Sequence, residues 1–138
     1  MKKQTIGSLI SACLVLAAGV VTVQADTYNW DPARTGSTSG GSGGSGTWNL
    51  TTANWYDSSV GSEFAWNNSG TNTAVFGGAA GGTVTLGTSL VGTNLQFTTA
   101  GYTLAGTGPL TLWGGLDASA LSSGTATVSV PVTVQGHN

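Results

Sequence analysis

The sequence has very little positive charge. Its 138 residues include only three lysines and arginines together, and one histidine. Lys2 and Lys3 stand at the very start, so residues 26–138 keep Arg34 alone against all five acidic residues. A chain this poor in Lys and Arg lacks the electrostatic footprint that binds nucleic-acid phosphates or an anionic membrane surface. We therefore expect no nucleic-acid partner.

The residue types that carry catalysis and metal binding are also scarce. His137, the only histidine, is next to the last residue, and Cys13, the only cysteine, lies in an N-terminal apolar run. A serine nucleophile therefore has no base, and a zinc ion lacks the His, Cys or acidic ligands it needs. Asp57 and Glu63, the nearest acids of the folded part, are interpreted as solvated loop residues and not as a glycosidase pair. We expect no catalytic residue, cofactor or metal, and hence no enzyme.

Helical patterning is missing as well. After residue 25, no window places apolar residues at the i, i+3, i+4 and i+7 positions of an amphipathic helix. Val, Leu, Thr and aromatic residues recur instead, and glycine is frequent, with 23 in the chain. Those apolar and β-branched types favour a pleated, half-buried surface. The sequence predicts an all-β fold, held without disulfides once Cys13 is removed.

The start of the chain has the order of a secretory signal peptide. Lys2 and Lys3 precede an apolar run over residues 6–23, and polar sequence begins directly after Ala25. We predict a signal peptide over residues 1–25, cleaved between Ala25 and Asp26 by the export machinery, which leaves no stable membrane span in the mature chain. Two alternatives stay open. The run approaches the length of an uncleaved transmembrane anchor, and the residues before Cys13 are similar to a lipoprotein acylation site.

Two segments of different composition follow. Residues 26–46 form a Gly/Ser-rich N-terminal segment. It begins with Tyr28, Trp30 and a turn at Asp31-Pro32, and its residues 35–46 are interpreted as a flexible tract or loop because they have nothing to pack. Residues 47–138 form the folded head, and its first part is rich in aromatic residues, including Trp48, Trp55 and Trp66.

Short triplets of apolar, polar and apolar residues fill the rest of the head. In each triplet the first and third side chains share one face of a strand and the middle one points to the other face. Glycines separate most of these triplets and supply the conformations that tight corners require. The predicted strands are Val84-Thr85-Leu86, Leu95-Gln96-Phe97, Tyr102-Thr103-Leu104, Leu110-Thr111-Leu112, Val128-Ser129-Val130 and Val132-Thr133-Val134.

Two architectures fit such short strands. The favoured one is the start of a parallel β-helix, or β-solenoid, whose stacked coils bury a narrow apolar interior behind an aromatic-rich N-terminal cap. The alternative is a β-sandwich, which usually has longer strands and more regular turns. Because Val132-Thr133-Val134 still belongs to the triplet pattern, no second cap is visible. We expect the head to be truncated at its C-terminus and to continue in a longer protein.

The order of these motifs resembles the N-terminal head of exported proteins with autotransporter-associated β-strand repeats, also called passenger-associated-transport-repeat proteins. The match runs from about Trp48 to Val134. It rests on Ala53-Asn54-Trp55, Trp66, Ala74-Val75-Phe76-Gly77, Gly101-Tyr102-Thr103-Leu104-Ala105-Gly106, Ala126-Thr127-Val128 and three of the triplets above.

The resemblance implies a right-handed β-helical passenger on the outer surface of a Gram-negative bacterium, or secreted from it. Such passengers serve as stalks, adhesins or display scaffolds, so the implied function is non-enzymatic and adhesin-like, with an unknown surface or polysaccharide ligand. In the family a C-terminal β-barrel or a sorting anchor provides attachment. Neither occurs within these 138 residues, and only the entry into the family's Gly-rich repeat is present.

The tryptophans suggest one alternative function. Aromatic faces combine a large apolar area with a polar handle, so exposed indoles at Trp48, Trp55 and Trp66 would form a platform for stacking sugar rings. The chain would then be a secreted carbohydrate-binding module. The favoured interpretation is that these indoles fill the cap and core of a domain without disulfides.

Overall fold

The computed structural model of the protein describes residues 25–36 and 40–136. The predicted signal peptide, apart from Ala25, lies outside these residues, and so do Cys13 and His137. Within the described ranges the regular secondary structure consists of strands, which confirms the predicted all-β class. No helix in this part of the chain is long and apolar enough to cross a membrane.

The described residues contain strands of two to eight residues, which the sequence separates with glycines and other turn-forming residues. Their bounds are β1 (Thr27–Trp30), β2 (Gly46–Trp48), β3 (Trp55–Asp57), β4 (Ser62–Phe64), β5 (Thr73–Phe76), β6 (Thr83–Leu86), β7 (Leu90–Phe97), β8 (Thr103–Gly106), β9 (Leu110–Asp117), β10 (Thr127–Val128) and β11 (Val132–Val134). Each of the six predicted triplets overlaps one of β6 to β11.

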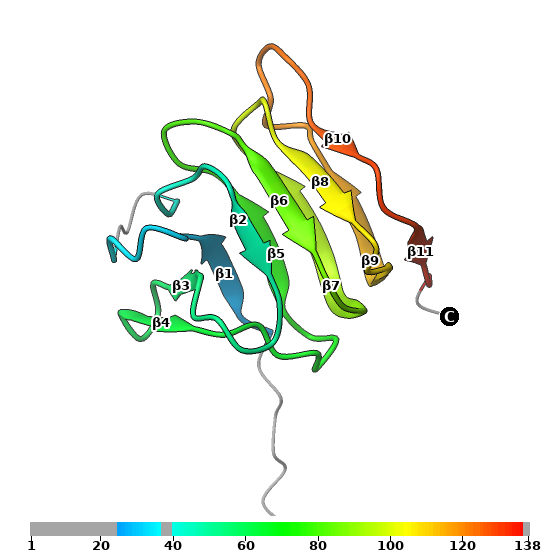
Figure 1. Ribbon diagram of the computed structural model, residues 1–138, viewed down its shortest axis with the longest axis horizontal. Coiled ribbons are helices and arrows are strands. Elements are labelled where there is room, and N and C mark those ends of the chain that lie inside the picture. Colours follow the sequence, from blue (N-terminus) through cyan, green and yellow to red (C-terminus); the bar gives the residue numbers. More distant parts are fainter. Residues whose placement is uncertain (1–24, 37–39, 137–138) are drawn as a thin grey trace, which may run out of the picture.

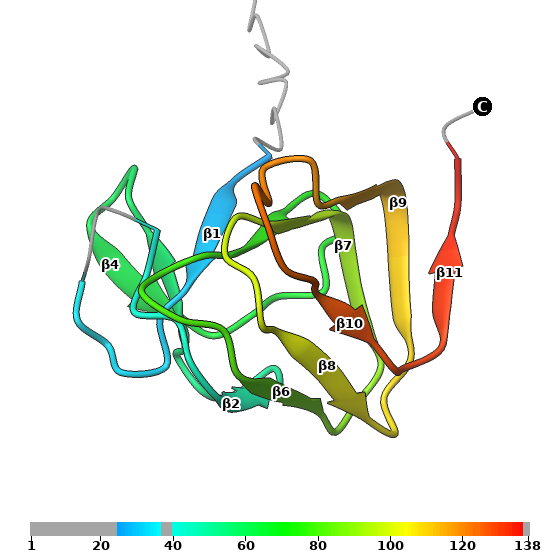
Figure 2. The ribbon, with the colours of Figure 1, turned by 90° about the horizontal axis from the view of Figure 1, so that it is seen from above.

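These strands form two sheets that face each other across the core, as the views in Figures 1 and 2 show. The larger sheet has the order β11-β9-β7-β5-β1-β3-β4, and the smaller one has the order β10-β8-β6-β2. From β5 to β11 the chain alternates between the two sheets, one strand at a time. Neighbouring strands of a sheet are therefore connected through a strand of the opposite sheet.

This alternation makes nearly all strand pairs parallel. In the larger sheet Ala74 pairs with Leu95, which in turn pairs with Leu116, and in the smaller sheet Val84 pairs with Leu104. From β5 onward, paired residues stand 20 to 24 positions apart. Each circuit of the chain through both sheets thus places similar side chains above those of the circuit before.

The antiparallel pairs lie at one end of the larger sheet. There β3 pairs with β1 on one side and with β4 on the other, and the turn between β3 and β4 contains the exposed Val60. β1, which comes from the Gly/Ser-rich segment, joins this hairpin to the parallel strands by pairing with β5. The aromatic-rich part of the sequence therefore occupies the end of the molecule at which parallel stacking begins.

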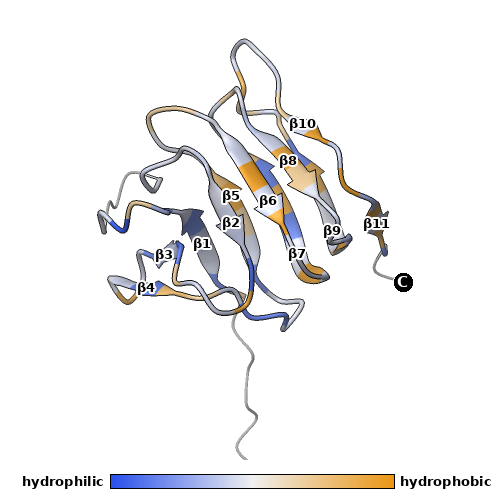
Figure 3. Ribbon diagram, viewed as in Figure 1, coloured by the Kyte–Doolittle hydropathy of each residue, from blue (hydrophilic) through white to orange (hydrophobic). Residues whose placement is uncertain are grey.

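The core lies between the two sheets and is filled by the apolar residues of the triplets. Figure 3 shows strongly hydrophobic residues on the strands of the smaller sheet. The first and third residues of the predicted triplets at 84–86, 95–97, 102–104 and 110–112 are all at most 1% exposed. The prediction that they point inward is confirmed.

The last predicted triplet differs from this pattern. Val132 and Val134 are 37% and 54% exposed, although both were expected to point into the core. The reason is the position of β11, which is the final strand in the order of the larger sheet and pairs only with β9. Its apolar side chains therefore lack the neighbours that cover those of β7 and β9.

Two positions show why the turns between the two sheets require glycine. Gly78 has a φ of 86°, and a Cβ at this position would overlap the backbone of Gly43. Gly106 has a φ of 114°, and a Cβ there would overlap the backbone of Leu86. Because side chains rarely adopt such φ values and would also clash, both corners require glycine for the chain to turn from one sheet to the other.

Candidate functional site

The three tryptophans that could have formed a binding platform lie in the core. Trp48 and Trp55 are fully buried, and Trp66 is 2% exposed. Their ring centroids are 4.9–5.0 Å apart, in edge-to-face or tilted geometry. Such pairs of rings stabilise a core beyond the area that they bury.

The polar ends of these indoles also point into the protein. The Nε1 group of Trp66 donates to the Val91 carbonyl at 2.9 Å. The Nε1 atoms of Trp48 and Trp55 are buried and have no hydrogen-bond partner within the described part of the chain. No ring face is left for a sugar. This geometry favours the packing interpretation over the platform, and Trp113, at 40% exposed, is the indole that reaches the surface.

Asp57 and Glu63, the acid pair considered from the sequence, do not face the same space. Asp57 pairs with Ser62 across the β3–β4 hairpin, and Glu63 pairs with Tyr56, so the two side chains leave opposite faces of the sheet. Asp57 Oδ1 accepts hydrogen bonds from the Ser59 amide and hydroxyl at 2.8 and 2.6 Å, which fixes the turn. A glycosidase needs two carboxyl groups facing one bond, and this pair does not provide them.

A different acid pair forms between segments far apart in the sequence. Asp31 has no exposed surface, and its carboxylate accepts hydrogen bonds from the Gly36 amide at 2.9 Å, the Ser42 amide at 3.1 Å and the Thr35 hydroxyl at 3.1 Å. Burial raises the pKa of Asp31, but the bonds from Ser42 and Thr35 and the neighbouring Glu63 outweigh it and lower the pKa to about 2. Asp31 therefore holds the Gly/Ser-rich segment against β4 as an anion.

Glu63 lies beside this anion and has the opposite behaviour. Both of its carboxyl oxygens are buried, and none of the described residues forms a hydrogen bond of good geometry with them. Burial is the largest cause that raises its pKa, the Asp31 carboxylate adds to it, and together they outweigh the Gly36 amide and Arg34 and bring the pKa to about 7. A carboxyl group with this pKa holds its proton through the acidic range in which an ordinary glutamate is charged.

We predict that this pair gives the protein a stability maximum on the acidic side of neutrality. The pKa of Glu63 is raised in the fold, so the free energy of unfolding falls as the pH rises from the ordinary value of 4.5 to about 7. The pKa of Asp31 is lowered, so stability also falls when the pH drops from 3.8 toward about 2. The free energy of unfolding, measured with urea across this pH range, should be highest near the ordinary pKa values of 3.8 and 4.5. It should decline by on the order of 2 kcal/mol toward neutral pH.

Glu63→Gln tests whether Glu63 causes the predicted decline in stability toward neutral pH. The amide has the same shape and does not titrate, so the decline toward neutral pH should disappear and the variant should be the more stable protein at pH 8. A Glu63→Gln protein whose stability still falls between pH 4.5 and 7 would show that another group causes the decline.

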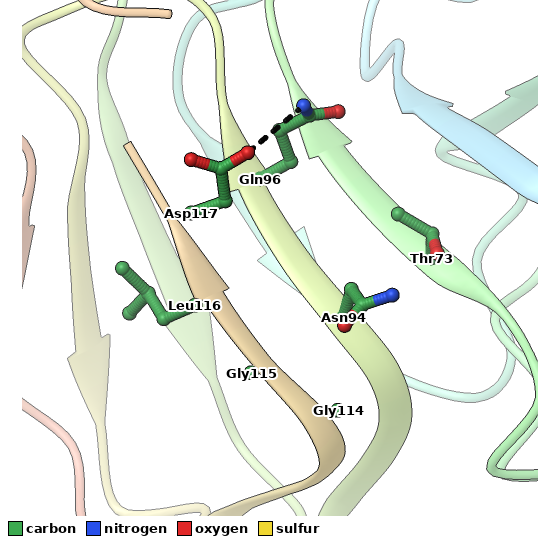
Figure 4. Close-up of a pocket in the computed structure, with 7 residues that line it drawn as sticks. All are labelled: Thr73, Asn94, Gln96, Gly114, Gly115, Leu116 and Asp117. Carbon is green, nitrogen blue, oxygen red and sulfur yellow. Dashed lines mark hydrogen bonds between the residues drawn. The ribbon is translucent and has the colours of Figure 1, made fainter. Parts of the chain in front are cut away.

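A concave surface lies on the outer face of the larger sheet, away from the buried rings. This groove has a volume of about 390 Å³ and is lined by Thr73, Asn94, Gln96, Gly114, Gly115, Leu116 and Asp117. The lining residues come from β5, β7 and β9, and Figure 4 shows their side chains along these neighbouring strands. A volume of this size is within the range of about 300–1,000 Å³ of small-ligand sites.

Strand register brings the polar groups of the groove together. Thr73 pairs with Asn94, Asn94 pairs with Gly115, and Gln96 pairs with Asp117. A register shift between Gly92 and Asn94 interrupts the ladder of β7 and β9 at one end of this set. The two glycines leave β9 without side chains where Asn94 faces it, which creates the hollow.

The polar atoms of the groove are only partly satisfied by the protein. Asp117 Oδ1 accepts from the Ser119 amide at 2.8 Å, whereas Oδ2 has only a long contact of 3.4 Å with Gln96 Nε2. Hydrogen bonds from Ser119 lower the pKa of Asp117, so its carboxylate is charged at neutral pH. Among the described residues, no group is hydrogen-bonded to the side-chain amide of Asn94 or to the hydroxyl of Thr73, although the backbones of both residues belong to the strand ladder. Donors and acceptors thus remain open to a ligand.

Sequence reasoning did not identify this groove. The triplet pattern marked Gln96 as an outward residue, and Asp117 was noted only as one of the acids. Asn94 and Gly115 do not belong to any sequence motif. They are 21 residues apart, and only the pairing of β7 with β9 brings them together. No group of three or more His, Cys, Asp or Glu residues that could hold a metal ion occurs in the described part of the chain.

Comparison with known proteins finds a relative among the autotransporters. The chain is 42% identical over 125 residues to the protein named Adhesin BmaC autotransporter of Brucella suis biovar 1 (strain 1330), an alignment that covers 88% of this chain. The chain spans only about 3% of the length of that protein. No family model matches the sequence, and no solved structure matches it. The chain is therefore similar to one short stretch of an autotransporter adhesin.

Proposed function

We propose that this chain is a non-enzymatic, adhesin-like structural segment of an autotransporter-related passenger, exported to the outer surface of a Gram-negative bacterium. In this proposal the two sheets are two faces of a β-solenoid of the autotransporter-associated β-strand repeat type. Residues 1–25 direct export, residues 26–46 form the first strand and its Gly/Ser-rich loop, and residues 47–138 form the solenoid head.

The observation that carries this proposal is the parallel stacking of successive circuits. Strands of a β-sandwich commonly pair antiparallel through hairpins and Greek-key connections. Here β5, β7, β9 and β11 are parallel neighbours in one sheet, and β6, β8 and β10 are parallel neighbours in the other. Coils that add one strand to each sheet in turn are the building principle of a solenoid, which lengthens without changing its cross-section.

The antiparallel end supports the role proposed for the aromatic block. A stack of parallel coils leaves unpaired backbone groups at its ends, and terminal units must cover them. The β3–β4 hairpin and β1 occupy one end of the larger sheet, and the core rings Trp48, Trp55 and Trp66 lie behind them. This end has the properties of an N-terminal cap.

The similarity to a stretch of an autotransporter adhesin supports the proposed location and the adhesin-like role. It also agrees with a chain that is nearly free of basic residues beyond position 25, because a surface scaffold requires no phosphate-binding site. The ligand of such a segment would be a molecule outside the cell.

Labelling of intact cells tests the proposal directly. An epitope inserted into the exposed turn at residues 58–61, between β3 and β4, should leave the core untouched because these four residues lie at the surface. With the natural gene and its complete downstream reading frame, antibody should bind intact cells as strongly as permeabilised ones. The matched control lacks residues 2–25 and should be labelled only after permeabilisation. If the unmodified leader gives the same result as this control, the chain is not a surface passenger.

A further inference from the structure

The groove between β5, β7 and β9 has a composition that selects one class of ligand. It offers acceptors at Asp117 Oδ2 and the side-chain oxygen of Gln96, and it offers donors at the side-chain amide of Asn94 and the Thr73 hydroxyl. Sugar hydroxyls both donate and accept, so neighbouring hydroxyls of one ring can engage this mixed set.

The charge and position of the groove exclude other classes of ligand. Its one charged group is the carboxylate of Asp117, and no Lys, Arg or His lies among the lining residues. An anionic ligand such as a phosphate or a sulfated polymer would therefore meet repulsion without compensation. A peptide that adds to a sheet pairs with the backbone of a free strand edge, whereas Thr73, Asn94 and Gln96 belong to strands that are paired on both sides and present their side chains on the sheet face.

We infer that this groove binds a neutral carbohydrate through Asn94, Gln96 and Asp117. The inference rests on the proposed function for its biological setting, since a sugar would be the external ligand of the surface segment. The site is distinct from the buried indoles of Trp48 and Trp55, which have no exposed ring face. Because the groove is open and presents few groups, we expect dissociation constants of about 0.1–10 mM.

Two glycines provide a matched pair of variants. Gly115 lies in the groove, and a Cβ at this position would meet no atom within 4 Å. Gly87 lies outside the groove, directly after β6, and a Cβ there would also meet no atom within 4 Å. Neither has a positive φ. Leucine at either position should be accepted by the fold, but only Gly115→Leu fills the groove.

Titration of the isotope-labelled protein with lactose, maltotriose and N-acetylchitotriose tests the inference. At least one of these sugars should shift the side-chain amide signals of Asn94 and Gln96 in NMR spectra. Gly115→Leu should weaken this binding at least about tenfold, while Gly87→Leu should bind like the unmodified protein. Urea unfolding of both variants checks that the fold is retained.

Three results would overturn the inference. The first is that none of the three sugars shifts the Asn94 and Gln96 signals at concentrations up to about 50 mM. The second is that Gly115→Leu binds sugar as tightly as Gly87→Leu does. The third is that sialyllactose binds as tightly as lactose despite its negative charge. These outcomes are separate from the proposed function. Labelling of intact cells does not depend on the groove, and the sugar titration of the purified protein does not depend on export.

Discussion

Replacing Trp55 by alanine is expected to lower the free energy of unfolding by about 3–5 kcal/mol, the largest effect of any single change proposed for this protein. Trp55 has no exposed surface, and its ring lies 4.9–5.3 Å from four other aromatic rings, centroid to centroid. Alanine would leave a cavity that rings in fixed, interlocking orientations cannot close. Because proteins of this size have only about 5–15 kcal/mol of stability, the loss is a large part of the total.

Two further substitutions make the measurement specific. Trp55→Phe keeps an aromatic ring and removes an Nε1 group that has no partner, so it should cost less than alanine. Trp113→Ala removes an indole that is 40% exposed and should cost less than about 1 kcal/mol. Equal losses for Trp55→Ala and Trp113→Ala in urea unfolding would contradict the assignment of Trp55 to the centre of the core.

Asp31→Ala is expected to destabilise the protein by about 3 kcal/mol at neutral pH, which is the second-largest effect. The substitution removes the acceptor of the Gly36 and Ser42 amides and of the Thr35 hydroxyl, all of which lie in or beside the Gly/Ser-rich segment. Bonds to a buried carboxylate are stronger than those between neutral groups. Thr35, Gly36 and Ser42 would lose the group that holds them together.

Asp117→Ala is the control for this prediction. Asp117 also accepts a hydrogen bond from a serine amide, but it is exposed, so its removal should change stability by no more than about 0.5 kcal/mol. Asp31→Ala should in addition lower the pKa of Glu63, because one of the two main causes that raise it is gone. A Glu63 carboxyl that titrates unchanged in Asp31→Ala, measured by carbon NMR, would show that the two acids do not interact.

The strands of the core could be predicted because their information is local. In Val84-Thr85-Leu86 and Leu110-Thr111-Leu112 the alternation of apolar and polar residues is enough to assign both the strand and its inward face. For Val132-Thr133-Val134 the same rule placed the strand correctly but not the burial of its side chains. Burial depends on which neighbours cover a strand, and the pattern within a triplet contains no information about its neighbours.

The acid pair shows a second limit. Asp57 and Glu63 were paired on the basis of sequence distance, but the alternation of a strand sends them to opposite faces. Asp31 and Glu63 are 32 residues apart, and no motif in the sequence connects them. Gly36 and Ser42 both lie at Asp31, because its carboxylate accepts hydrogen bonds from the backbone amides of both residues.

By itself, the sequence determined the all-β class, the inward rows of Val, Leu and Phe residues, and the absence of nearly all basic groups from residues 26–138. These properties follow from composition and from a period of two, which any strand must obey whatever it pairs with. The tertiary structure decided which strands became neighbours, that Trp48, Trp55 and Trp66 are buried, and that Asn94, Gly115 and Asp117 form one groove. The physical reason is that parallel stacking joins residues about one circuit apart, and contacts at that separation depend on the packing of the whole chain.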